Sequence, residues 1–148
     1  MIVNAEGQIL GRLATFVAKK ALLGEEMIVV NAEKAIISGR KEDILARELA
    51  KLNIKNIGNY RKGPFHQRRP DKFVRRSIRG MLPYKKARGR EALKRVMVYI
   101  GIPENEIKKN HNINIKKEKI QDLKLKKREV NGISVGELCA SIGGKWRR

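Results

Sequence analysis

The residue types that most often carry catalysis are few in this chain and far apart. The only cysteine, Cys139, has Leu138 and Ile142 as neighbours on the apolar side of a predicted helix, and the two histidines, His66 and His111, lie far from it in the sequence. A free thiol packs as a small apolar side chain, so we expect Cys139 in the core. One cysteine and two histidines at these separations offer no metal-ligand spacing. We therefore expect no catalytic residue, no metal site and no cofactor.

A glycine-containing turn and two acidic pairs are the remaining candidates for chemistry. The segment Gly7–Arg12 lies between a predicted strand and a predicted helix, but its spacing matches neither the dinucleotide-binding nor the P-loop fingerprint. We expect a tight turn, whose helix N-terminus could still contact a nucleic-acid phosphate. Glu25-Glu26 and Glu42-Asp43 are adjacent in sequence, and adjacent side chains on a helix point apart. These acids are predicted to be ordinary surface charges.

Basic residues dominate the chain and concentrate in its middle. The 148 residues carry 35 Lys and Arg against 15 Asp and Glu, a formal net charge of +20. Residues 56–95 hold 14 of these cations and only two acids. Such a field indicates a polyanionic partner. No apolar run approaches the roughly 18 residues that cross a membrane, and Met1–Glu6 does not resemble a signal peptide, so we predict a cytoplasmic nucleic-acid binder with no membrane and no small-molecule substrate.

The candidate binding residues follow from this concentration of charge. The acid-free segment 61–70 mixes Gly and Pro with cations, so we expect it to be irregular and to order when phosphates neutralise it. The bend at residues 80–83 is predicted to anchor Met81 and Leu82 in the core and to aim the cations that follow. The predicted RNA-binding residues are Arg61, Lys62, His66, Arg68, Arg69, Lys72, Arg75, Arg76, Arg79, Lys85, Lys86, Arg88, Arg90, Trp146, Arg147 and Arg148. Further candidates, for which a salt bridge is an equal explanation, are Arg12, Lys34, Arg40 and Lys41.

Four aromatic side chains lie among these cations, where a ring can stack on an unpaired base. They are Tyr60, Phe65, Tyr84 and Trp146. A place in the core is the alternative for each. Only for Trp146, in a tail too short to bury it alone, do we prefer a contact with RNA or protein.

The elements that must position these residues alternate between strand and helix in the first half of the chain. Residues 2–3 and the apolar run 27–30 are predicted strands, and the helix between them has apolar residues at helical spacing from Leu10 to Ala21. This order indicates a parallel crossover and an α/β fold. Further elements are predicted at 35–37 and 96–100 as strands and at 41–52, 71–79 and 91–95 as helices.

The last third differs in composition. Residues 111–128 alternate isolated Ile and Leu with Lys, which favours a half-exposed pair of strands or an extended arm. Ser134 and Glu137 resemble a capping box, so a short helix is predicted over 135–142. We divide the chain into an α/β core, residues 1–103, with a basic RNA-binding segment at about 56–95, and a basic C-terminal extension, residues 104–148.

Three motifs cover residues 1 to about 103. They are Asn4–Ala14, then Val29–Lys34 with Ser38–Lys41, and then Arg79–Pro83 leading to Lys94–Pro103. In residues, order and spacing they resemble the motifs of the ribosomal protein L13 family of the large subunit, in the form typical of archaea and similar to the eukaryotic relatives.

The resemblance implies a three-layer α/β/α domain around a mostly parallel four-stranded sheet, with basic loops and a C-terminal extension. It also implies a structural constituent of the large ribosomal subunit that binds and organises ribosomal RNA early in assembly, beside neighbouring ribosomal proteins. Bacterial members carry a His- and Gly-rich loop where this chain has residues 60–69, and they lack the extension from about 104. Their contacts in these segments therefore do not carry over.

Charge alone leaves other functions open. A DNA-binding protein is the main rival, although no helix-turn-helix, zinc-finger or basic-zipper pattern is visible. An RNA-binding repressor outside the ribosome is compatible with the same residues. A nucleotide-binding enzyme would need a phosphate-cradling motif and a catalytic constellation that the chain does not supply.

Overall fold

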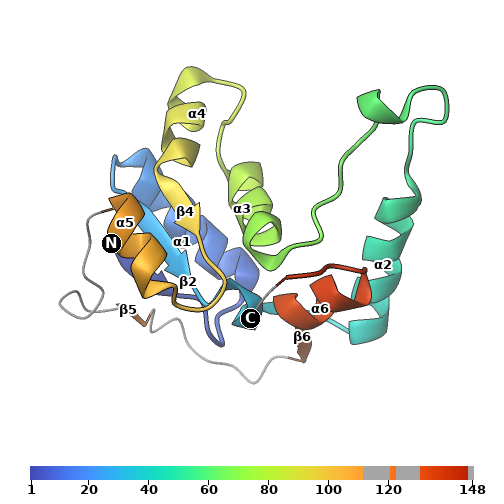
Figure 1. Cartoon of the computed structure of the whole chain (residues 1–148), viewed down its shortest axis with the longest axis horizontal. Coiled ribbons are helices and arrows are strands. Elements are labelled where there is room, and N and C mark those ends of the chain that lie inside the picture. The colour runs from blue at the N-terminus through green and yellow to red at the C-terminus, as the bar shows by residue number, and fades with distance from the viewer. Residues whose placement is uncertain (112–120, 123–130, 147–148) are drawn as a thin grey trace.

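The computed structural model describes residues 1–111, 121–122 and 131–146 (Figure 1). Its elements are β1 (Ile2–Asn4), α1 (Leu10–Leu22), β2 (Met27–Val30), η1 (Ala32–Lys34), β3 (Ile36–Ser38), α2 (Lys41–Asn53), η2 (Tyr60–Lys62), α3 (Pro70–Met81), α4 (Ala87–Lys94), β4 (Val96–Val98), α5 (Glu104–His111), β5 (Gln121–Asp122), β6 (Gly132–Ser134) and α6 (Val135–Ser141). Most of the segment 111–128, predicted as a strand pair or an extended arm, lies outside the described residues, as do Arg147 and Arg148.

Four parallel strands form the main sheet, in the order β4-β2-β1-β5. Every residue of β2 is buried, as expected for a continuous apolar strand covered on both faces. Val29 in its centre pairs with Val3 on one side and with Val98 on the other. The parallel crossover predicted from the strand–helix–strand order is confirmed by β1, α1 and β2.

Helices cover both faces of this sheet, because alternate residues of each strand point to opposite sides. Val3 and Val29 belong to the main core cluster, on which α1, α3 and α4 pack. Ile2 and Ile28 face the other way, where they meet Ile107 of α5, which is fully buried. Figure 1 shows α5 and α1 on opposite sides of the strands. The α/β fold with a mostly parallel sheet is therefore confirmed, and α5, which the sequence analysis did not predict, completes the third layer.

A second, smaller sheet lies beside the first. The strand predicted at 35–37 is present as β3, and it pairs antiparallel with β6 rather than joining the main sheet. Ile44 of α2, Ile133 of β6 and Leu138 of α6 form a separate core cluster there. The backbone N–H of Glu137 donates to the Ser134 hydroxyl over 3.1 Å, which confirms the N-terminal half of the predicted capping box and the helix after it. Residues after 103 thus pack on both sheets.

The two helices of the basic segment start earlier than predicted, and the side chain of Met81 is exposed rather than buried. Helix α3 begins at Pro70, and α4 begins at Ala87 rather than at 91. Leu82 is buried as predicted, but the prediction that Met81 anchors the bend in the core was wrong, because its side chain is 44% exposed. As the last residue of α3 it lies against the surface of α1, where its sulfur accepts a hydrogen bond from Thr15 Oγ1 over 3.3 Å.

Candidate nucleic-acid interface

Helix α3 turns an apolar side to the core and a basic side outward. Val74 and Ile78 lie one turn apart on this helix. Both are fully buried and belong to the main core cluster. Four cations recur at positions i, i+3, i+4 and i+7, a spacing that places them along one side of a helix. They are Lys72, Arg75, Arg76 and Arg79. Because the buried side fixes the helix, these four cations are held in a row.

The row lines a groove of about 570 Å³, which we call the α3 groove. Its lining residues are Phe65, Gln67, Lys72, Arg75, Arg76, Arg79 and Leu93. Phe65 and Gln67 come from the loop before α3, and Leu93 comes from α4, so three parts of the chain converge on it. Among the described residues that line the groove there is no acid.

Three of the four cations are oriented by uncharged groups. Arg76 Nη1 donates to the carbonyl of Phe65 over 2.8 Å, and Arg75 Nη2 donates to the carbonyl of Leu93 over 3.4 Å. The guanidinium carbon of Arg79 lies 5.2 Å from the centre of the Tyr84 ring, a cation–π distance. Within the part of the chain that the structure describes, none of the four forms an ion pair. Since a guanidinium has five N–H donors, each arginine retains donors for a phosphate.

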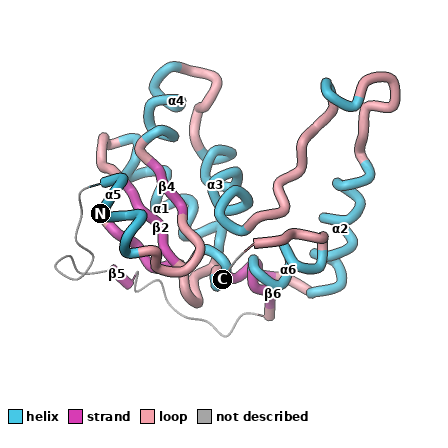
Figure 2. Tube along the Cα trace, viewed as in Figure 1, coloured by secondary structure: helices cyan, strands magenta, loops and turns pink. Residues whose placement is uncertain are grey.

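The loop between α2 and α3, residues 54–69, extends the basic surface, and we call it the basic arm. Figure 2 shows this loop reaching away from the sheets and returning to α3, with η2 near its far end. It carries no acid, and its cations are Lys55, Arg61, Lys62, Arg68 and Arg69. His66 Nε2 lies 3.5 Å from the carbonyl of Ile54, a contact that brings the two ends of the arm together. Arg69 pairs with Asp71 over 3.2 Å, so this acid in the first turn of α3 is already neutralised.

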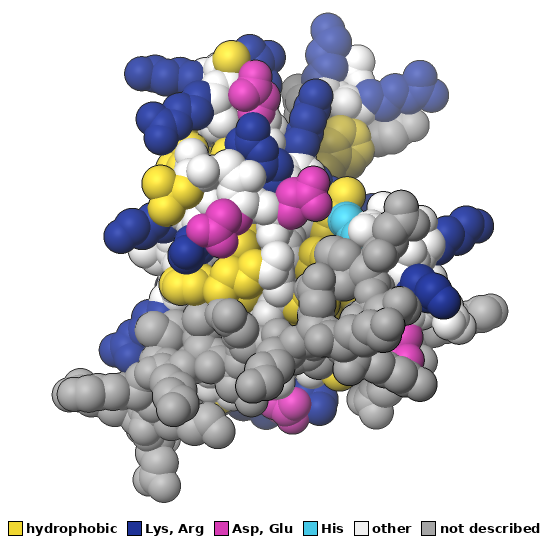
Figure 3. Space-filling view, turned by 90° about the vertical axis from the view of Figure 1, so that its left-hand side faces the viewer, with side chains coloured by type: hydrophobic (Ala, Val, Ile, Leu, Met, Phe, Trp, Pro, Cys, Tyr) yellow, Lys and Arg dark blue, Asp and Glu magenta, His cyan; other side chains and the backbone are white. Residues whose placement is uncertain are grey.

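The cations after the bend form a second exposed cluster, on and just before α4. Its members are Lys85, Lys86, Arg88 and Arg90. A Cβ atom at Gly89 would lie 2.1 Å from the Pro83 carbonyl oxygen, so only glycine lets α4 approach the bend this closely. That approach fixes where the cluster points. In Figure 3, Lys and Arg side chains gather at the upper end of the molecule, around α4.

The additional candidates divide into paired and exposed cations. Lys34 Nζ lies 2.9 Å from a carboxylate oxygen of Glu6, and this hydrogen bond raises the pKa of Lys34 above its ordinary value. Lys41 is paired with Glu137 of α6. Arg12 and Arg40 are exposed, on α1 and at the start of α2. For Lys34 and Lys41 the salt-bridge alternative is therefore the one that the structure contains.

The prediction that Cys139 lies in the core is confirmed. Its side chain is fully buried in the main core cluster, and burial raises the pKa of its thiol to about 12. Trp146, for which the sequence analysis favours a contact with RNA or protein, is half-buried and packs against the same cluster.

The other candidates for chemistry have structural roles or no ligand geometry. Gly7 has φ +68°, and its N–H donates to the Lys34 carbonyl over 3.3 Å, which confirms the tight turn. Among the described residues, no group of three or more His, Cys, Asp or Glu could hold a metal ion.

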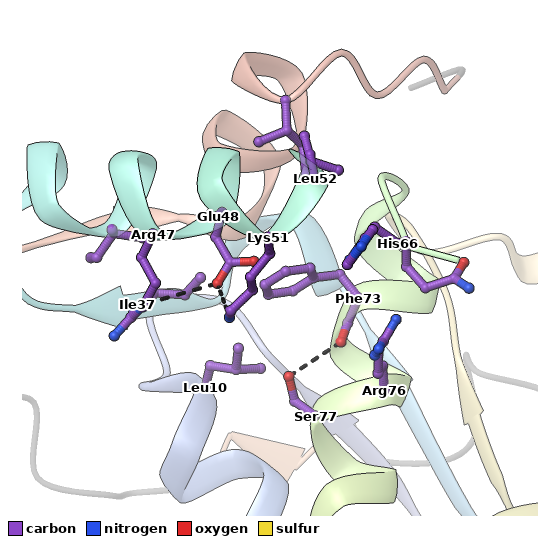
Figure 4. A pocket seen from close by; sticks show the side chains of 13 residues that line it. Leu10, Ile37, Arg47, Glu48, Lys51, Leu52, His66, Phe73, Arg76 and Ser77 are labelled. Atoms are coloured by element: carbon purple, nitrogen blue, oxygen red, sulfur yellow. Dashed lines mark hydrogen bonds and ion pairs between the residues drawn. The ribbon is translucent and has the colours of Figure 1, made fainter. Parts of the chain in front are cut away.

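A second cavity lies on the other side of α3, between it and α2, and we call it the α2–α3 hollow (Figure 4). It measures about 390 Å³, and apolar side chains such as Leu10, Ile44 and Phe73 form much of its lining. Figure 4 shows Glu48 pointing into it from α2, with an oxygen 2.6 Å from Lys51 Nζ and 4.0 Å from Arg47 Nε. His66 lines this hollow and not the α3 groove.

Sequence reasoning missed several of these lining residues. The spacing of Glu48 and Lys51, i and i+3 on a predicted helix, was a usable signal for an ion pair. Nothing in the sequence pointed to Gln67 or Leu93, because their place in the α3 groove depends on how the arm and α4 pack against α3.

Comparisons with known proteins agree with the motifs. The chain matches the family model described as Ribosomal protein L13 over residues 1–105. It is similar to proteins named large ribosomal subunit protein uL13 from three archaea. It is 46% identical to that of Methanococcus maripaludis over 147 residues, 99% of each chain, and 50% identical to that of Methanocaldococcus jannaschii over 149 residues, 98% of each chain. The protein of Methanosarcina barkeri is 42% identical over 146 residues, 98% of this chain and 99% of its own. In the described part of the chain, no helix has the length and apolar character to span a membrane.

Proposed function

Because the chain belongs to the ribosomal protein L13 family, it is a structural, non-enzymatic component of the large ribosomal subunit, and we propose that it binds and organises ribosomal RNA through the α3 groove. The row of four cations along α3 carries this proposal. Arginine and lysine without acidic partners in a groove present free donors and uncompensated charge to a phosphate backbone. The buried side of α3 holds the row in place before RNA arrives, so little ordering is required of the helix itself.

We propose the basic arm and the α4 cluster as further contacts with the same RNA. They flank the groove along the chain, and together they give a surface that can meet phosphates from several RNA helices at once. The arm residues are Arg61, Lys62, Arg68 and Arg69, and the α4 cluster is Lys85, Lys86, Arg88 and Arg90. Phosphate contacts of this kind set position and orientation rather than sequence preference.

We also propose that the chain joins the subunit early in assembly and works on cytoplasmic ribosomes beside other ribosomal proteins. A basic arm without acids repels itself until RNA neutralises it, and it can enter between RNA helices most easily before they are closed around it. Depletion of the protein should then stall an early precursor of the large subunit, one that lacks proteins added later. A precursor that is complete except for this chain would contradict early entry.

The rival polyanion is DNA, and a salt series separates the two. We would measure binding of the purified chain to large-subunit ribosomal RNA, to an equal mass of unrelated structured RNA and to duplex DNA. Preference for the ribosomal RNA that survives at about 0.15 M salt, with a log–log slope of roughly 0.7–0.9 per phosphate contact, is the expected result. Equal affinity for all three polymers at every salt concentration would overturn the proposal.

A further inference from the structure

Phe65 is the aromatic side chain of the α3 groove, and its ring is not part of the core. It is 66% exposed, whereas Phe73 of α3 packs against two of the core clusters. The backbone of Phe65 is nevertheless held, because its carbonyl accepts the 2.8 Å hydrogen bond from Arg76. The exposed ring of Phe65 therefore offers an apolar face to a ligand, while its backbone is held in place.

The groups around this ring are those that a single nucleotide requires. The four cations of the groove provide donors for phosphates, and the exposed ring provides an apolar face for a base. Gln67 offers an amide donor and acceptor for a base edge, and Leu93 adds a second apolar side chain. A volume of about 570 Å³ has room for a nucleotide beside these side chains.

We propose that the α3 groove binds an unpaired nucleotide of RNA, with its base stacked on Phe65 and its phosphates on the α3 cations. The inference rests on the proposed RNA-binding function and names the form of RNA at that site. Duplex RNA hides its base faces in the helical stack, so it can satisfy the cations but not the ring. An exposed ring on a held backbone, in a groove lined by cations, therefore fits single strands, loops and bulges, where base faces are accessible.

The test uses the full chain with two probes of known form, a ten-nucleotide single-stranded oligouridylate, whose bases stack little on one another, and a ten-base-pair RNA duplex, both at about 0.1 M salt. Phe65→Ala should weaken binding of the single strand by about 5- to 150-fold, the range that stacking of one base gives. Binding of the duplex should be unchanged, and Phe65→Tyr should retain the affinity of the single strand. A 2-aminopurine placed in the single strand should be quenched by the wild-type chain and not by Phe65→Ala.

Ile57 provides the matched control, because it is a fully exposed apolar residue on the same arm. Ile57→Ala should leave both probes unaffected, and circular dichroism should show that both variants are folded. Equal loss on single strand and duplex, or loss on neither, would overturn the inference, and the second outcome would leave Phe65 free for a protein neighbour. If Lys72→Gln with Arg79→Gln also left both probes unaffected, the proposed function itself would fail, so the two failures are distinguishable.

Discussion

The α3 groove and the α2–α3 hollow lie on opposite sides of one helix and share Gln67 and Arg76, yet they differ in how their cations are partnered. In the hollow, Glu48 lies between Lys51 and Arg47. In the groove, the arginines reach only carbonyl oxygens and a ring. Both regions are basic in sequence, but of the two lining sets only that of the hollow includes an acid.

The difference shows what turns a basic region into a binding site. Lys51 and Glu48, three residues apart on α2, stabilise their own helix, and an anion that bound there would have to compete with a carboxylate. An anion that enters the groove meets no carboxylate among the residues that line it. A count of cations along the sequence therefore overestimates the number of residues available to bind RNA. The positions of the acids show which cations are already paired.

The largest expected effect concerns the thiol of Cys139, which is buried and is influenced by the charges of Asp71 and Glu48. Burial is the main cause of its raised pKa, and the charges of Asp71 and Glu48 add to it. With a pKa of about 12 instead of 9.0, the thiolate fraction near neutral pH should be about a thousandfold lower than that of a free thiol. Labelling with a thiol-specific disulfide reagent at pH 8 should be slow in the folded chain and fast in denaturant.

The same shift fixes the sign of a pH effect on stability. The folded chain holds the thiol proton more tightly than the unfolded chain, so this contribution is intact below pH 9 and is lost as the pH rises toward 12. The free energy of unfolding should therefore fall over that range, and a Cys139→Ser variant should lack this component. Rapid labelling of the folded chain at pH 8 would show that the thiol is not enclosed.

The buried side of α3 supports both regions, so it should matter for stability and not for affinity. Ile78→Ala should lower the free energy of unfolding by about 2–5 kcal/mol, because it leaves a cavity against the main core. Met81→Ala, at an exposed position of the same helix, should change it by less than about 1 kcal/mol. Urea denaturation measures both. RNA affinity of the folded Ile78→Ala chain should match the wild type, and a large loss there would mean that one cavity is enough to displace the row of cations.

Much of this fold was predictable from local pattern. Residues 27–30 form an apolar run that predicts a strand covered on both faces, and Pro70 with the apolar residues Phe73 and Ile78 predicted the helix that carries the interface. The helix α5 was missed because its single buried residue, Ile107, gives no periodicity. Pro103 and the acids of its first turn were the available signals.

The site was predictable in its residues but not in its shape. The sequence placed Lys72, Arg75, Arg76 and Arg79 in one basic helix, and the structure places them in one groove. It could not place Phe65 beside them or Trp146 against the core, because both depend on where an irregular segment meets distant elements. The division of the chain at residue 103 stays a prediction.

Charge removal on either side of α3 tests the comparison directly. Lys72→Gln with Arg79→Gln and Arg47→Gln with Lys51→Gln each remove two cations, so the two variants have equal net charge. The groove variant should lose about tenfold in affinity for large-subunit ribosomal RNA at about 0.1 M salt, with a log–log salt slope lower by roughly 1.4–1.8. The hollow variant should lose less than about threefold. Equal losses would mean that RNA senses the net charge of the chain and not the groove.

The smallest effect to measure follows from moving one acid. Glu48→Gln should release Lys51 and Arg47 in the hollow and so raise affinity for RNA by a few-fold, at a cost of up to about 1 kcal/mol in the free energy of unfolding. Gln67→Glu should do the reverse, because Gln67 lines the groove as well as the hollow, and the substitution adds a carboxylate to the lining of both. Filter binding across a salt series resolves changes of this size.

The two substitutions alter net charge by one unit in opposite directions, so a generic polycation would show equal and opposite effects on RNA affinity. If the partnered state of each cation decides binding, Gln67→Glu should weaken RNA binding by a larger factor than Glu48→Gln strengthens it, because it acts on the surface that RNA already uses.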